Sequence, residues 1–130
     1  MDDIIKEFME ETVEGLSTLD DKMITLEENP SDDDAVRNAF RIVHTIKGTC
    51  GFLGLTRLER VAHDSENLLG AFRDGKLEPN GERMQVIFEA IDRIKDIVND
   101  INENEGEESE GDDSDILNQI RDIIAKSSDN

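Results

Sequence analysis

Residues 87–101 read IFEAIDRIKDIVNDI, a sequence that predicts a helix with one continuous apolar stripe. Its aliphatic positions, Ile87, Ile91, Ile94, Val98 and Ile101, recur at steps of four, three, four and three, so they share one helix face. This repeat is typical of the seam along which the helices of left-handed bundles pack. The stretch therefore predicts one helix of a bundle, and the preceding residues should supply the helices that cover its stripe.

Three further segments with helical periodicity precede this stretch. The first ends at residues 29–30, an Asn-Pro pair, and the second follows the acidic run 31–34, which suits the positive end of a helix dipole, and ends at Gly54. The third opens with Thr56 and Glu59, whose spacing predicts a capping box. Short connections favour antiparallel neighbours, so the expected fold class is all-α, an antiparallel four-helix bundle. The positions expected to face inward are Ile5, Met9, Leu16, Leu19, Met23, Leu26, Val36, Ala39, Phe40, Val43, Ile46, Cys50, Leu53, Leu58, Val61, Ala62, Ser65, Leu68, Leu69 and Phe72.

The remaining chain divides by composition. Residues 102–113 are rich in Asp and Glu and hold no basic or apolar side chain, so they are expected to form an acidic, flexible linker. The bundle is therefore assigned to residues 1–101. Residues 114–126 predict a fifth, amphipathic helix with Ser114 as its cap and a stripe of isoleucines at 116, 120 and 123. That stripe either docks on the bundle or recruits another protein.

The charge balance excludes several classes of function. The formal net charge is −19, which argues against a nucleic-acid partner because binding phosphates needs a basic surface. No apolar run approaches the roughly 20 residues of a membrane span, so no membrane partner is expected. A single Cys50 cannot form an internal disulfide, and we interpret it as a small buried hydrophobe. These features favour a cytoplasmic chain, and its charge favours a monomer.

The histidine at position 44 lies in a locally basic part of this acidic chain. Between residues 35 and 58 there are arginines and one lysine but no Asp or Glu. At about 100° per residue, His44 lies about 80° from Val36, at the border of the apolar face of its helix. Gly48 and Gly51 continue this strip without side chains, so another protein can approach the imidazole closely. Arg37 and Arg41 complete the expected partner surface.

The third predicted helix offers a matching strip with His63 and Glu66. If the second and third helices pack antiparallel, either of these side chains can face His44. A carboxylate that accepts one imidazole N–H leaves the other ring nitrogen unprotonated and able to attack. Glu66 is our candidate for this orienting role, and Lys47 is expected to reach toward His44 and screen the charge of a phosphoryl group.

The sequence also resembles a known family. Residues 44–49 read HTIKGT and are followed by a His-x-x-Glu pair at His63 and Glu66, a pattern that resembles the histidine-phosphotransfer (HPt) domains of chemotaxis kinases of the CheA family. The resemblance covers about residues 1–126. It implies that His44 is phosphorylated at Nε2, that Glu66 hydrogen-bonds its Nδ1, and that Lys47 and His63 complete the site.

The same resemblance implies the partners. A kinase domain that binds ATP phosphorylates the histidine, and the phosphoryl group then passes to an aspartate of a response regulator of the CheY or CheB type. This chain has no nucleotide-binding motif of its own, so we expect it to be a phosphocarrier fragment of a longer kinase that binds no cofactor itself. ATP is then the phosphoryl source on another domain.

Two alternatives from other classes remain open at this stage. A metal-binding bundle could use Glu59, His63, Glu66 and His44, although di-iron bundles carry Glu-x-x-His on two helices and this chain has the reverse order once. A helical interaction module without catalysis would use the isoleucine stripe of its fifth helix. No metal ligand is predicted in the preferred interpretation.

Overall fold

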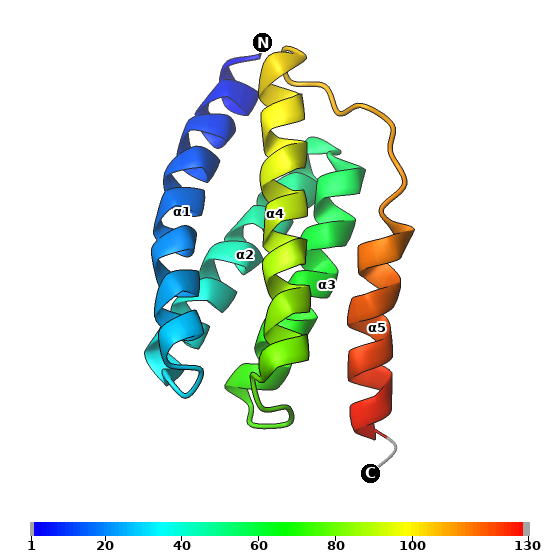
Figure 1. The fold of residues 1–130 in the computed structure, drawn as a ribbon. Coiled ribbons are helices and arrows are strands. Elements are labelled where there is room, and N and C mark those ends of the chain that lie inside the picture. The colour runs from blue at the N-terminus through cyan, green and yellow to red at the C-terminus, as the bar shows by residue number, and fades with distance from the viewer. Residues whose placement is uncertain (1, 129–130) are drawn as a thin grey trace.

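The computed structural model describes residues 2–128, which form five helices (Figure 1). They are α1 (Asp3–Glu28), α2 (Asp33–Leu53), α3 (Thr56–Arg73), α4 (Gly81–Glu103) and α5 (Ser114–Ser128). The first four run alternately up and down and enclose one core, which confirms the predicted antiparallel bundle. The described part of the chain contains no strand, and none of its helices is long and apolar enough to cross a membrane.

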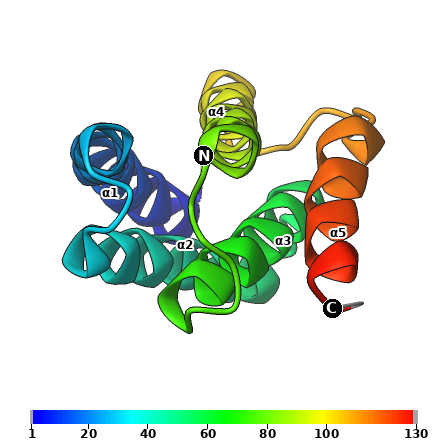
Figure 2. The ribbon, with the colours of Figure 1, turned by 60° about the horizontal axis from the view of Figure 1, so that its bottom comes forward.

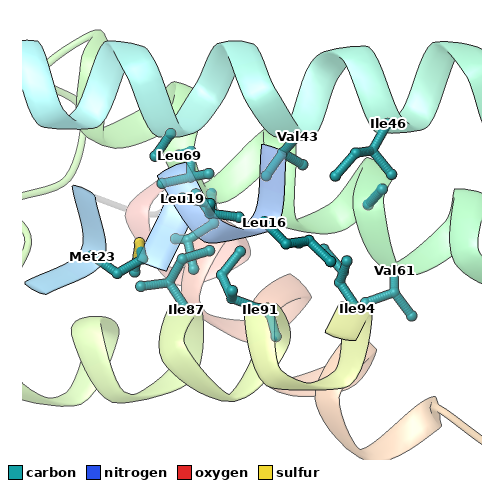
Figure 3. Close-up of a cluster of buried hydrophobic side chains, with 14 of the residues drawn as sticks. Leu16, Leu19, Met23, Val43, Ile46, Val61, Leu69, Ile87, Ile91 and Ile94 are labelled. Atoms are coloured by element: carbon teal, nitrogen blue, oxygen red, sulfur yellow. The ribbon is translucent and has the colours of Figure 1, made fainter. Parts of the chain in front are cut away.

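The core is built from the stripe that the sequence predicted on α4. Its five aliphatic side chains, Ile87 to Ile101, are each at most 2% exposed. Figure 3 shows Ile87, Ile91 and Ile94 in a cluster with Leu16, Leu19 and Met23 of α1 and with residues of α2 and α3. Burying a side chain of this size contributes about 1.5–3 kcal/mol, so the seam is a large part of what holds the helices together.

Local rules set most of the helix ends. The side chains of Asp2, Asp32 and Asn80 accept hydrogen bonds from the first free backbone N–H groups of α1, α2 and α4, at 2.8, 3.0 and 3.2 Å. Gly54 ends α2 with φ of 74°, the left-handed conformation that glycine adopts without strain. The predicted stop at residues 29–30 is also confirmed, because α1 ends at Glu28.

The capping box predicted at the start of α3 is wrong. Thr56 is already helical, and the capping residue Leu55 offers no side-chain acceptor. The carboxylate of Glu108 takes this place instead, accepting the backbone N–H groups of Arg57 at 3.2 Å and Leu58 at 2.7 Å. A carboxylate from outside the helix reaches two donors at once and its charge also complements the helix dipole, so the local motif is not used.

The same contact shows that residues 102–113, expected to form an acidic, flexible linker, are bound in part to the bundle. Helix α4 continues to Glu103, and beyond it the backbone N–H of Ser109 donates to Asp100 at 2.7 Å. Glu108 caps α3, and the side chain of Asp113 is only 7% exposed. A segment without apolar side chains buries little apolar surface, but these residues are held to the bundle by hydrogen bonds and ion pairs. Flexibility of the rest of the segment stays a prediction.

Helix α5 docks on the outside of the bundle, against α3 and α4 and away from α1 (Figure 2). Ile116, Leu117 and Ile120 are buried there, so this stripe is covered by the chain's own bundle and does not favour the partner-recruiting alternative. Helix α5 begins at Ser114 itself, so the prediction that Ser114 caps it is wrong. The N–H of Ser114 instead donates to the preceding Asp112 at 2.9 Å.

Ion pairs fix the orientation of α5. Asp113 accepts hydrogen bonds from Arg57 of α3 at 2.8 and 2.9 Å and from Arg93 of α4 at 2.8 Å. Arg93 also binds Asp115 at 2.9 Å, and Arg121 binds Asp64 of α3 at 2.9 Å. The hydrogen bonds from Arg57, aided by those from Arg93, hold the pKa of Asp113 below its usual range although burial opposes this.

Replacing Asp113 by Asn is therefore expected to lower the free energy of unfolding by about 1–3 kcal/mol, because two arginines lose their charged acceptor. Urea denaturation at neutral pH measures the change, with Asp122→Asn on the exposed face of α5 as the control that alters net charge equally. Because the pKa is lowered on folding, the contribution is present above the unfolded value of about 3.9 and is lost as pH falls through the folded value. Equal losses in the two variants would contradict the assignment.

Candidate functional site

His44 projects from the middle of α2 with 59% of its side chain exposed. Its Nδ1 lies 2.7 Å from Oε1 of Glu66, which comes from the facing helix α3. A carboxylate can only accept a hydrogen bond, so Nδ1 carries a proton, and in the neutral imidazole Nε2 then keeps a free lone pair. The predicted border position of His44 and its pairing with Glu66 are both found in the structure.

Glu66 is well buried, with only 11% of its side chain exposed. Burial alone disfavours the carboxylate, but hydrogen bonds from Lys47 and His44 outweigh it and hold the pKa of Glu66 below its usual range. The residue is therefore ionised at neutral pH, which is the state that can accept the Nδ1 proton.

Lys47 reaches Glu66 and not the ring itself. Its ammonium lies 2.7 Å from Oε2 of Glu66, on the oxygen that His44 leaves free. The carboxylate of Glu66 is thus bound at both oxygens, by His44 and by Lys47, which lies one turn further along α2. The sequence predicted that the ammonium of Lys47 reaches toward His44. In the structure Lys47 lies near His44, but its ammonium binds Glu66.

His63 does not join this group. It lies exposed on α3, and its only hydrogen-bond contact among the described residues is with Asn67, at 3.5 Å between Nδ2 and Nε2. The spacing puts His63 and Glu66 one turn apart on α3, and a hydrogen bond to His44 is made by Glu66. The role predicted for His63 in the site stays a prediction.

Sequence reasoning missed Phe40. It was expected in the core, yet it is only partly buried and its ring stacks on His44, with centroids 6.0 Å apart and planes 8° from parallel. The guanidinium of Arg73 lies over the Phe40 ring at 4.2 Å from its centroid. The sequence spacing could have indicated this contact, because Phe40 lies one turn before His44 on α2 and therefore on the same side of the helix.

The predicted partner surface is exposed in the structure. Gly48 has open space where a side chain would begin, and Gly51 borders the carboxylate of Glu59, 3.6 Å from where its Cβ would be. Arg37 and Arg41 are both exposed on the same helix. Phe52, two turns beyond His44, is 81% exposed, so this end of α2 presents apolar as well as bare surface.

The metal-binding alternative finds no support in the geometry. Within residues 2–128, no three His, Cys, Asp or Glu side chains come together in an arrangement that could hold a metal ion. Cys50 is fully buried in the core, and burial raises the pKa of its thiol to about 12, so it stays a protonated, apolar side chain as predicted.

A helical bundle that exposes an imidazole and anchors the Nδ1 of that ring on a buried carboxylate has the architecture of a histidine phosphotransfer domain. Comparison with known proteins agrees. Residues 3–104 match the Hpt domain, and the chain belongs to this family.

Relatives in this family come from chemotaxis proteins. The chain is 35% identical over 101 residues to the chemotaxis protein CheA of Bacillus subtilis, covering 78% of this chain and 15% of that protein. It is 30% identical over 130 residues to the sensor histidine kinase CheAY of Helicobacter pylori, covering 100% of this chain and 16% of that one. The chain thus spans only a small part of the relatives it matches.

A solved structure resembles almost the whole chain. It is the phosphorylated P1 domain of CheA3 in complex with CheY6 from R. sphaeroides, with a TM-score of 0.87 and 27% identity. The match covers 98% of this chain and 99% of that one, so the likeness extends beyond the four-helix bundle to α5.

Proposed function

We propose that this chain is the phosphocarrier domain of a chemotaxis histidine kinase, with Nε2 of His44 as the phosphorylated atom. The observation that carries the proposal is the 2.7 Å contact between Nδ1 and the ionised Glu66, because it leaves Nε2 as the one ring nitrogen with a free lone pair. The exposure of the ring gives a partner domain access to that nitrogen.

The first step is phosphoryl transfer from ATP, held by another domain. The Nε2 lone pair forms a bond to the γ-phosphorus, the bond from that phosphorus to the bridging oxygen breaks, and ADP leaves with the electron pair. The imidazole gains positive charge in this step, and Glu66 stabilises that charge through the Nδ1 proton. In this scheme a separate kinase domain binds ATP, and the present chain carries the phosphoryl group.

Lys47 balances the charge of Glu66 in this scheme. An anionic carboxylate next to the nucleophile repels the incoming phosphoryl group, and the ammonium 2.7 Å from Oε2 offsets that repulsion. Arg37 and Arg41 add a weak local attraction for an acidic or phosphorylated partner on the same exposed helix.

The second step passes the phosphoryl group to a response regulator of the CheY or CheB type. A carboxylate oxygen of the regulator's aspartate bonds to phosphorus, the bond from Nε2 to phosphorus breaks, and the electron pair returns to Nε2. Open space at Gly48 lets the regulator approach the ring closely. The complex of the similar P1 domain of CheA3 with CheY6 supports this class of partner. We place both steps in the cytoplasm.

Incubation with a separate histidine-kinase catalytic domain and ATP tests the proposal. We expect one acid-labile phosphoryl group, located at His44 by mass spectrometry, and its loss from the chain when a CheY-type receiver domain is added. A chain that gains no phosphoryl group, or gains it at His63, contradicts the assignment. Retention of the label in the presence of an active receiver contradicts the second step.

A further inference from the structure

One hydrogen bond does not fix the plane of the His44 ring. The contact between Nδ1 and Glu66 places one atom, but an exposed imidazole can still swing about that contact and turn Nε2 away from an incoming phosphorus. Transfer requires the lone pair to point along the line of attack, and misplacement by about 1 Å can cost roughly 100-fold in rate. A second contact, on the ring face, is needed to set its direction.

Phe40 supplies this second contact. Its ring lies parallel to His44 within 8°, at a centroid distance of 6.0 Å, inside the roughly 4.5–7 Å range of favourable aromatic pairs. Both residues stand on α2 one turn apart, so the stack also joins the imidazole to the rigid helix that carries it.

Helix α3 in turn holds Phe40 in place. The guanidinium of Arg73 lies 4.2 Å from the Phe40 centroid, a cation–π contact. The backbone of α3 at Gly70 lies directly against the ring, since a Cβ there would make an ordinary van der Waals contact with Cε2 of Phe40 at 3.4 Å. Glu66, Gly70 and Arg73 are spaced one turn apart on one face of α3. The same face therefore holds the edge of the imidazole through Glu66 and its plane through Phe40.

We infer that Phe40 is a positioning residue for phosphoryl transfer, held by Arg73 and packed against α3 at Gly70, so that its ring fixes the direction of Nε2 of His44. The inference rests on the proposed function and names a part of the site beyond the residues that touch the phosphoryl group. It assigns the planar ring at position 40 a role in rate and not only in packing.

The test compares Phe40→Leu with Phe40→Tyr. Leucine keeps an apolar side chain but has no planar face, so the rate of phosphorylation by an ATP-loaded kinase domain should fall roughly 10- to 100-fold. The fall should appear in kcat, with KM for the kinase domain unchanged, because the docking surface is intact. Tyrosine keeps the ring and should restore a rate near that of the unmodified chain.

Phe88→Leu is the matched control, since Phe88 is also partly buried but packs on the core from α4. Nitrogen chemical shifts of the His44 imidazole provide a second readout, and the proton should stay on Nδ1 in Phe40→Leu. An unchanged kcat in Phe40→Leu, or an equal fall in Phe88→Leu, overturns the inference. Failure of the unmodified chain to accept a phosphoryl group at His44 overturns the proposed function instead, so the two failures are distinguishable.

Discussion

His44→Gln is expected to abolish acid-labile phosphoryl incorporation while leaving the helical content of the chain unchanged. Glutamine is neutral, hydrogen-bonding and of similar reach, but its amide nitrogen has no lone pair able to attack phosphorus. The side chain at position 44 is 59% exposed, so its replacement removes little buried surface and should change the free energy of unfolding by less than about 0.5 kcal/mol. Labelling with ATP and a separate kinase domain, together with circular dichroism, measures both properties.

His63→Gln is the matched control for this result. It makes the same chemical change at an exposed histidine of α3 whose one hydrogen-bond contact within residues 2–128 is with Asn67, so labelling should persist at the level of the unmodified chain. Undiminished labelling of His44→Gln, or its disappearance in His63→Gln, removes His44 from the role of phosphoacceptor.

Much of the fold follows from local sequence. The four-three repeat of residues 87–101 predicts both a helix and the stripe it buries, because periodicity reports directly on which side chains share a face. The stops at residues 29–30 and at Gly54 follow from backbone chemistry that any chain obeys. The pairing of His44 with Glu66 was also accessible, since two helical wheels and an antiparallel connection suffice to face them.

The contacts between distant segments could not be predicted in the same way. Glu108 and the residues it caps, Arg57 and Leu58, are about 50 positions apart in the chain. No local rule favours Glu108 over the nearer Glu59, because the choice depends on where the returning segment passes over α3. The acidic composition of residues 102–113 indicated solvation, yet acidic side chains are also the groups that bind helix N-termini and arginines.

Phe40 illustrates a similar limit within the site. Its helical position put it near the apolar face, and the structure shows its ring packed against the core while also lying beside His44 and under Arg73 of α3. Lys47 was expected near the imidazole for its charge, but the second oxygen of a buried carboxylate is the stronger attraction. In both cases the position of the side chain depends on residues of α3, which the sequence of α2 alone does not reveal.

Glu66→Ala is expected to lower the rate at which His44 accepts a phosphoryl group by roughly 10- to 100-fold, the range typical for removing the hydrogen-bond partner that orients a metal-bound histidine. Without an acceptor at 2.7 Å, the proton is no longer confined to Nδ1, so a fraction of the rings present a protonated Nε2 that cannot attack. The positive charge that develops on the ring also loses its counter-charge. Lys47 is 27% exposed and can turn to water, so the bundle should stay folded.

Glu66→Gln separates the two contributions of the carboxylate. The amide oxygen still accepts the Nδ1 proton, so nitrogen chemical shifts should show the same tautomer as in the unmodified chain, while the rate falls because the charge is gone. Glu66→Ala should lose both the tautomer preference and the rate. Glu59→Ala is the control, since Glu59 is a partly buried carboxylate of the same helix that faces Gly51 and not His44. A Glu66→Ala chain that is phosphorylated as fast as Glu59→Ala contradicts the orienting role, whatever its effect on stability.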